Sequence, residues 1–134
     1  MARKKTAIDA EKLAKVIAAG MQEKKAEHIV QLDLRNSRGA VTDFFVICTG
    51  TSDTHVQAIA DSVEDMVRKH LSEKPWHTEG YKVGQWVLLD YVNVVAHVFL
   101  RDNREFYGLE ELWADAPVLK IEKMIKLPAP VVAG

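Results

Sequence analysis

The sequence predicts a single α/β domain in which helices pack on a mixed β-sheet. Two observations lead to this prediction. The chain has 134 residues, of which 48% are hydrophobic and 28% charged, the size and composition of one globular domain with a packed core. Segments with helical spacing of apolar residues also alternate with strand-like segments, in the order helix, strand, strand, helix, strand, strand, short helix. The order of the strands within the sheet is left open.

The first helix is expected over residues 9–25. Its apolar residues recur every three or four positions, and Asp9 stands before them as a candidate N-cap. From residue 30 to residue 35 apolar and polar side chains alternate, which is the pattern of a half-buried strand. The polar residues 36–39 then predict a turn.

A continuous apolar run over residues 44–49 predicts a strand that is covered on both faces and is therefore central in the sheet. The only cysteine of the chain, Cys48, lies in this run, so we expect it to be a buried hydrophobic residue. A single cysteine excludes an internal disulfide. After a turn at residues 50–53, an apolar stripe over residues 56–71 predicts a long amphipathic helix.

Two further strands, at residues 85–91 and 94–100, are expected to form an antiparallel hairpin. They meet at Val92 and Asn93. A β-branched valine is a poor residue for the positive φ that a tight hairpin turn requires, so the turn type and the local register stay open. Residues 109–113 predict a short helix.

The expected organisation is a basic N-terminal extension at residues 1–8, a domain at residues 9–117 and a C-terminal extension at residues 118–134. We expect the last segment to fray after Leu127, because two prolines follow. No apolar signal-peptide stretch follows the basic N-terminus, and no run of about eighteen apolar residues occurs. A cytoplasmic location is therefore expected.

The net charge of −1 does not favour nucleic acid as the main partner. Non-specific binding to RNA depends mostly on a basic surface that neutralises phosphates. A mildly acidic protein is better suited to a basic protein partner, because opposite charges speed their encounter.

The turn at residues 50–53 lies between a buried strand and a helix, where backbone N–H groups can bind a phosphate. The glycine-rich motifs of phosphate-binding loops do not occur. Helix capping by Ser52, or by Thr54 with Gln57, is the better interpretation, since serine and threonine are preferred N-caps.

Transfer chemistry through metal ions needs carboxylates that converge on the metal. The only acid-x-acid triplet begins at Asp9, at a helix start, while Asp61 and Asp65 fall on the solvent side of a helix. The five histidines, His28, His55, His70, His77 and His97, lack the spacing of metal ligands. The sequence therefore predicts no catalytic residue, no metal and no cofactor.

Strand alternation separates the side chains of the 85–91 segment into two faces. Trp86, Leu88 and Asp90 share one face, and Val87, Leu89 and Tyr91 share the other. One face is expected in the core, and the other is a candidate binding surface with the aromatic, lysine-poor composition of interface cores. Whether Trp86 fills the core instead stays open. A hydrogen-bonded structural role is favoured for His97 over a catalytic one, because no nucleophile is evidently paired with it.

Several segments, in the same order along the chain, resemble the ribosomal silencing factors of the RsfS/Iojap family. The resemblance extends from about residue 13 to residue 117. The segments are residues 32–35 (LDLR), 42–52 (TDFFVICTGTS), 58–61 (AIAD), 79–80 (EG), 86–91 (WVLLDY), 97–99 (HVF) and 107–113 (YGLEELW). One departure is the hairpin, where the family usually has Gly-Asp and this chain has Val92 and Asn93.

The resemblance implies a nucleotidyltransferase-like fold without the transferase chemistry. It also implies a homodimer that binds the large ribosomal subunit through ribosomal protein L fourteen and sterically blocks joining of the small subunit. On strand alternation and the family's strand tryptophan, the partner-binding residues are expected to be Trp86, Leu88 and Asp90, with Glu79, Gly80 and His97 as lesser candidates. The alternative hypothesis is a nucleotidyltransferase-like enzyme that acts on a nucleotide substrate at the turn at residues 50–53.

Overall fold

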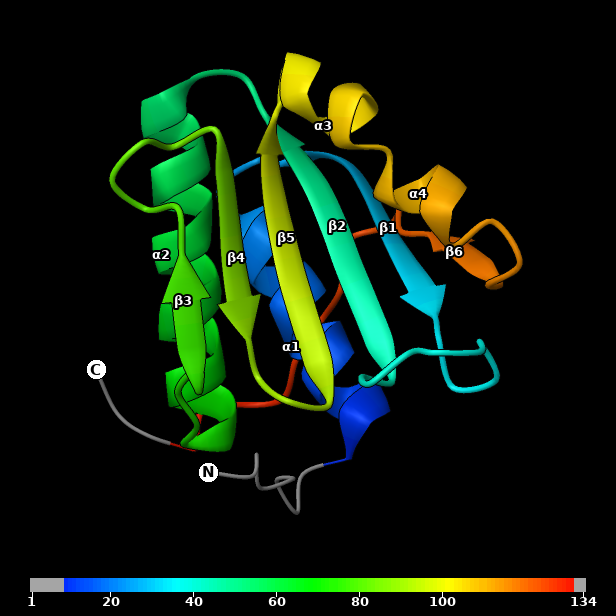
Figure 1. Cartoon of the computed structure of the whole chain (residues 1–134). Helices are drawn as coiled ribbons and strands as arrows, with labels where there is room; N and C mark the ends of the chain where they lie inside the picture. Colours follow the sequence, from blue (N-terminus) through cyan, green and yellow to red (C-terminus); the bar gives the residue numbers. More distant parts are fainter. Residues whose placement is uncertain (1–8, 132–134) are drawn as a thin grey trace.

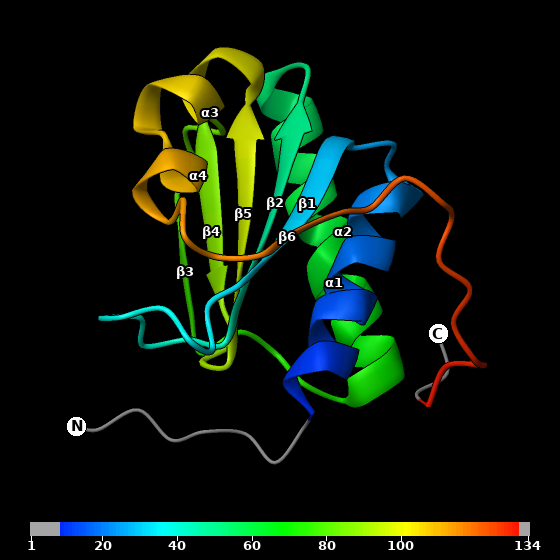
Figure 2. The ribbon, with the colours of Figure 1, turned by 90° about the vertical axis from the view of Figure 1, so that its right-hand side faces the viewer.

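A computed structural model describes residues 9–131, which form one α/β domain around a six-stranded mixed sheet (Figure 1). The helices are α1 (Ala10–Glu23), α2 (Asp53–Leu71), α3 (Arg101–Tyr107) and α4 (Leu109–Leu112). The strands are β1 (Glu27–Asp33), β2 (Phe44–Gly50), β3 (His77–Glu79), β4 (Trp86–Asp90), β5 (Val94–Leu100) and β6 (Val118–Lys120). Helices α1 and α2 cover one face of the sheet, and α3 and α4 lie on the other (Figure 2). The predicted fold class is confirmed.

The strand order is β3-β4-β5-β2-β1-β6, so β2 and β5 form the centre of the sheet. This pair is parallel, and every other pair is antiparallel. The central position predicted for the apolar run at residues 44–49 is confirmed, and Cys48 is fully buried there. Burial raises the pKa of its thiol above the usual range, which makes the group unreactive.

The main core lies between the sheet and the helices α1 and α2. These helices approach closely at Gly20, where an added Cβ would lie 2.8 Å from Cα of Val63. The Ser62 hydroxyl donates to the Gly20 carbonyl at 2.7 Å, and this bond satisfies both groups at the contact. The predicted N-cap of α1 is also present, since a carboxylate oxygen of Asp9 accepts from the Glu11 N–H at 2.9 Å.

The hairpin of β4 and β5 is antiparallel as predicted, and its tight turn places Val92 at φ +75°. Three hydrogen bonds hold this unfavourable conformation. The Val92 N–H donates to the Asp90 side chain at 2.8 Å, the Thr42 hydroxyl donates to the Val92 carbonyl at 2.9 Å, and the Asn93 N–H donates to the Tyr91 carbonyl at 3.0 Å. Neighbouring groups therefore compensate for a residue that local preference disfavours.

The segment after Pro117, which the sequence analysis assigned to a C-terminal extension, contributes to the sheet. Strand β6 pairs antiparallel with β1, and the apolar side chains of Ile121, Ile125 and Leu127 pack against the main core. The amide of Gln22 on α1 holds this segment at two points, because it donates to the Lys123 carbonyl at 2.8 Å and accepts from the Ile125 N–H at 2.9 Å. The residues expected to form the N-terminal extension, 1–8, lie outside the described residues.

Candidate partner-binding surface

The face of the sheet opposite α1 and α2 carries the side chains that the sequence analysis grouped as a binding surface. Trp86, Leu88 and Asp90 are half-buried there. Val87 and Leu89, which alternate with them along β4, are fully buried in the main core. The predicted division of β4 into a core face and a second face is confirmed.

The sheet register brings three of the predicted site residues into one row. Leu88 lies directly opposite Glu79 on β3 and opposite His97 on β5. Directly opposite side chains in adjacent antiparallel strands have Cβ atoms about 5 Å apart. Glu79, Leu88 and His97 therefore form a strip across the edge of the sheet, from an exposed carboxylate to a buried imidazole.

Aromatic rings in successive contact form what we call the aromatic band: Trp113, Phe45, His97, Trp86, Phe99, Tyr107 and Phe106. Trp86 lies in the middle, with ring centroids 4.8 Å from Phe99 and 4.6 Å from Tyr107. The band is buried at Phe99 and exposed at Phe106, which retains 81% of its accessible surface. The contacts between neighbouring rings hold the side chains of the band in defined positions.

His97 has a structural role within this band. Its Nδ1 accepts a hydrogen bond from the Trp86 indole N–H at 3.1 Å, which confirms the hydrogen-bonded histidine favoured from the sequence. Burial lowers the pKa of His97 to about 3, so the ring is neutral at ordinary pH and Nδ1 can accept. The neutral ring fixes the orientation of the Trp86 side chain.

Two other predicted site residues shape the surface through the backbone. The Asp90 carboxylate holds the hairpin turn by accepting from the Val92 N–H. Gly80 has φ +87°, and an added Cβ there would lie 1.9 Å from the carbonyl oxygen of Trp86. The loop after β3 can therefore pass the start of β4 only with glycine at this position.

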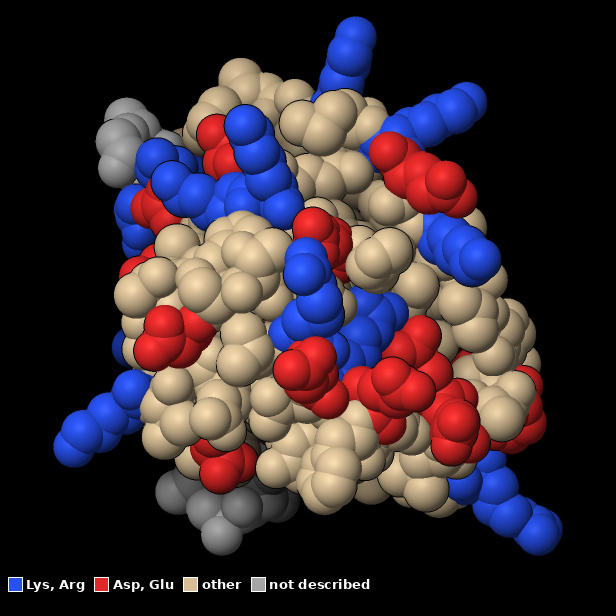
Figure 3. All heavy atoms as spheres, turned by 90° about the horizontal axis from the view of Figure 1, so that it is seen from above, with Lys and Arg blue, Asp and Glu red and all other residues tan. Residues whose placement is uncertain are grey.

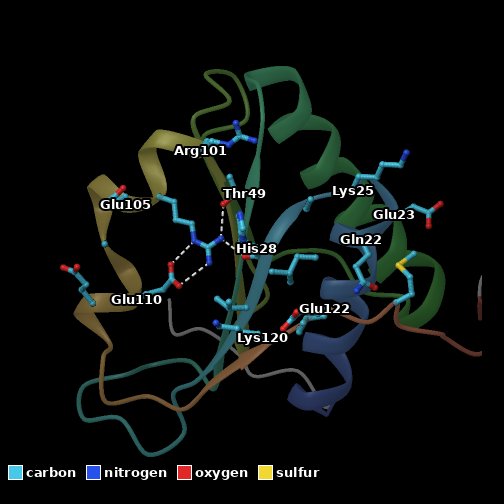
Figure 4. Close-up of a pocket in the computed structure, with 18 residues that line it drawn as sticks. Gln22, Glu23, Lys25, His28, Thr49, Arg101, Glu105, Glu110, Lys120 and Glu122 are labelled. Atoms are coloured by element: carbon cyan, nitrogen blue, oxygen red, sulfur yellow. Dashed lines mark hydrogen bonds and ion pairs between the residues drawn. The ribbon is translucent and has the colours of Figure 1, made fainter.

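Helices α3 and α4 form what we call the α3–α4 corner, residues 101–116, which the sequence analysis described only in part. Arg104 fixes it to the sheet, because its guanidinium donates to Thr49 Oγ1 at 2.9 Å, to the His28 carbonyl at 2.6 Å and to Glu110 at 2.8 Å. Figure 4 labels these three partners and marks the bonds as dashed lines. Only 13% of the Arg104 side chain is exposed. Charge-assisted bonds of this kind are the stronger class, so the corner has a fixed position.

A pocket of about 1190 Å³ lies between this corner, the start of β1 and the segment after β6 (Figure 4). Its lining includes both signs of charge, among them Lys25, Arg101, Glu105 and Glu122. Viewed from above, acidic side chains gather on the side where the α3–α4 corner lies, next to basic ones (Figure 3). Because these charges are mixed, the pocket is not specific for an anion or a cation.

The turn at residues 50–53 is a helix cap, as the sequence analysis favoured. The Ser52 hydroxyl accepts from the His55 N–H at 3.1 Å, and the Thr51 N–H donates to His55 Nδ1 at 2.9 Å. Asp61 and Asp65 are exposed on the outer face of α2. Within residues 9–131, no three histidine, cysteine, aspartate or glutamate side chains gather as metal ligands, and no helix is long and apolar enough to cross a membrane.

Comparison with known proteins gives one consistent result. The family model described as "Ribosomal silencing factor during starvation" matches residues 7–131. A ribosomal silencing factor of Halalkalibacterium halodurans is 38% identical over 115 residues, which cover 86% of this chain and 97% of that protein. The corresponding protein of Bacillus subtilis is 40% identical over 82% of this chain and 92% of its own length.

Solved structures show the same fold. A crystal structure from Bacillus halodurans superimposes with a TM-score of 0.71 at 35% identity, over 83% of this chain and 99% of that one. A second crystal structure, from Chromobacterium violaceum, gives a TM-score of 0.74 at 25% identity, over 94% of this chain and 95% of that one. A mouse protein named "Mitochondrial assembly of ribosomal large subunit protein 1" is 39% identical over 75 residues, or 54% of this chain and 32% of that protein.

Proposed function

This chain belongs to the ribosomal silencing factor family, and on that premise we propose that it binds the large ribosomal subunit through ribosomal protein L fourteen. Occupation of that protein's surface then prevents the small subunit from joining. The name of the mouse relative, which refers to assembly of the large subunit, supports the large subunit as the partner. The proposed mechanism is steric and requires neither catalysis nor a cofactor. The proposed location is the cytoplasm.

The observation that carries this proposal is the aromatic band together with the half-buried Leu88 beside it. Aromatic side chains are enriched in the cores of protein interfaces, whereas lysine is depleted. The band and its surroundings on β4 contain tryptophan, leucine and a carboxylate but no lysine. Ribosomal proteins are commonly basic, so the Asp90 carboxylate is suited to such a partner.

Co-sedimentation with isolated large subunits at moderate salt tests the proposal, and the Leu88→Ala variant locates the surface. Leu88 is only half-buried, so its truncation should leave the fold intact. We expect the wild-type protein to sediment with the subunits and Leu88→Ala to bind at least about tenfold more weakly, as for an interface residue near a hot spot.

Met124→Ala provides the matched control, because Met124 is 70% exposed in the segment after β6, away from β4. It should bind like the wild type. Failure of the wild-type protein to sediment with large subunits would contradict the proposed function, and equal binding by Leu88→Ala would move the contact away from β4.

We also propose a homodimer, which the family resemblance implies. The two edges of the sheet are the three-residue strands β3 and β6. On β6, Val118 is 55% exposed and Leu119 is 57% exposed. Unpaired edges and exposed apolar side chains favour symmetric pairing. Light scattering at micromolar concentration should give the mass of a dimer, and a monomer mass at all concentrations would refute this proposal.

A further inference from the structure

A groove of about 770 Å³ lies between the first half of α1, the β1–β6 edge of the sheet and the segment after β6. Lys15 of α1 lines this groove, and so do Lys120 and Lys123. Two more lysines, Lys12 and Lys126, are neighbours of lining residues in the chain. All five lysines are exposed, and we call this surface the lysine groove.

Nearby carboxylates do not neutralise the positive charge of the lysine groove. Among residues 9–131, the acidic residues that line it are Glu11 and Glu122, so five lysines against two carboxylates leave a net charge of +3. Glu11 is bonded to Arg35 at 2.9 Å, whereas none of the five lysines forms an ion pair with a carboxylate in the described part of the chain. The whole chain has a net charge of −1, so the groove is locally opposite in sign to the rest of the molecule.

The segment that carries Lys120, Lys123 and Lys126 is held in place by its backbone. Strand β6 pairs with β1, and the two hydrogen bonds of the Gln22 amide hold the chain that follows. The apolar side chains among these lysines pack against the main core: Ile121, Ile125 and Leu127. A partner that binds the lysines therefore has to order their side chains only, and not the chain that carries them.

The composition of the lysine groove favours a phosphate backbone as the partner. Lysine is depleted in the cores of protein interfaces, whereas lysine and arginine are the residues that neutralise phosphates. Among residues 9–131 no aromatic side chain lines the groove, so unpaired bases have no ring on which to stack. An RNA duplex keeps its bases paired and is bound mainly through its phosphates and sugars. The groove is therefore better suited to a duplex than to a single strand or an acidic protein.

The lysine groove is also separate from the aromatic band. Figure 2 shows that the chain leaves β6 toward the side of the sheet that carries α1, whereas α3 and α4 lie on the other side. The bonds to Gln22 on α1 agree with this path. A partner on β4 therefore leaves the groove accessible.

We propose that the lysine groove binds the backbone of double-stranded ribosomal RNA through its phosphates, without reading the base sequence. This contact goes beyond the proposed function, because it adds a nucleic-acid contact to the protein contact on β4 and can be tested without any ribosomal protein. Since the chain as a whole is slightly acidic, the contact is local, weaker than the protein contact and sensitive to salt.

The test measures the fluorescence anisotropy of a labelled RNA duplex of arbitrary sequence, titrated with the full chain over a series of salt concentrations. The wild type should bind at low salt, and the logarithm of its association constant should fall by about 3 to 5 per tenfold increase in salt, as for about four or five neutralised phosphates. The double variant Lys15→Gln with Lys123→Gln should reduce this slope by about 2 and weaken binding at low salt at least about tenfold. Both side chains are exposed, so the thermal midpoint should not change. Lys15→Arg with Lys123→Arg keeps both charges and should retain binding.

The matched control is Lys74→Gln with Lys82→Gln, which changes the net charge by the same amount at two exposed lysines outside the groove. It should bind the duplex like the wild type. Absence of duplex binding by the wild type, or equal losses in the groove pair and the control pair, would refute the proposal. Tighter binding of a single strand, or of a polyglutamate peptide, would show that the partner is not an RNA duplex and that our assignment is wrong. The proposed function is tested separately by co-sedimentation of Leu88→Ala, so it stands or falls independently of these results.

Discussion

Replacing Gly80 with alanine is expected to lower the free energy of unfolding by about 3 kcal/mol or more. Gly80 has φ +87°, a conformation that costs an L-residue about 1 to 2 kcal/mol. The new Cβ would also lie 1.9 Å from the oxygen and 2.9 Å from the carbon of the Trp86 carbonyl. Both are backbone atoms of β4, so the loop or the strand must move, which adds about 1 to 3 kcal/mol. Urea denaturation of both proteins measures the difference.

Gly39→Ala separates the two causes. Gly39 has almost the same φ, +83°, but no atom lies within 4 Å of the position of an added Cβ. This variant should lose only the conformational contribution, about 1 to 2 kcal/mol. Equal losses at Gly39 and Gly80 would show that the approach of the loop to Trp86 does not constrain the fold.

The displaced backbone in Gly80→Ala belongs to Trp86, so the variant should also bind large subunits more weakly at temperatures where it remains folded. Gly80 would then affect partner binding by positioning Trp86. A glycine can contribute to a binding site in this indirect way, although it has no side chain to contact the partner.

The spacing of apolar residues was sufficient to predict the helices and strands that bury a regular stripe or face. The apolar run at residues 44–49 is covered on both faces because α1 and α2 lie on one side, and a second cluster of buried side chains, which includes Leu32, Ile47 and Phe99, lies on the other. Alternation at residues 86–90 correctly placed Val87 and Leu89 in the core, because successive side chains of the regular strand β4 point to opposite faces of the sheet. These patterns reflect local geometry that the rest of the fold does not change.

Three elements lacked such a pattern. Strand β3 has only the residues His77, Thr78 and Glu79, at an exposed edge where no apolar alternation is required. Helix α3 begins directly after β5 without a side-chain cap and without a fully buried residue. Strand β6 exposes all three of its side chains, and it is a strand because its backbone pairs with β1. Each is determined by tertiary contacts rather than by its own sequence.

Sequence reasoning could predict only the part of the candidate site that lies on strands. Alternation grouped Trp86, Leu88 and Asp90, and the register then placed His97 and Glu79 in line with Leu88. The contact between the Tyr107 and Trp86 rings, whose planes are tilted by 42°, depends on the turn from β5 into α3. No local pattern in the sequence could place a ring of the next helix over a tryptophan at the start of β4.

Trp86→Ala is expected to have the largest effect on binding. An aromatic anchor in the middle of an interface is a frequent hot spot, so truncation should cost about 2 kcal/mol or more, a roughly thirtyfold weaker affinity for large subunits. Trp86 is half-buried and packs on Phe99 and Tyr107, so the fold will also lose stability. That loss should stay below the 3 to 5 kcal/mol typical of a fully buried aromatic residue, and the domain should remain folded.

Two further variants separate binding from stability. Leu89→Ala removes a fully buried side chain from the opposite face of β4, so it should lose about 2 to 5 kcal/mol of stability and keep its affinity while folded. Trp86→Phe retains an aromatic ring but leaves His97 Nδ1 without its donor, and an intermediate loss in both measurements is expected. Thermal midpoints are compared with large-subunit affinities for all three variants. If Trp86→Ala binds like the wild type, or is destabilised as strongly as Leu89→Ala, Trp86 belongs to the core and the partner contact must lie elsewhere.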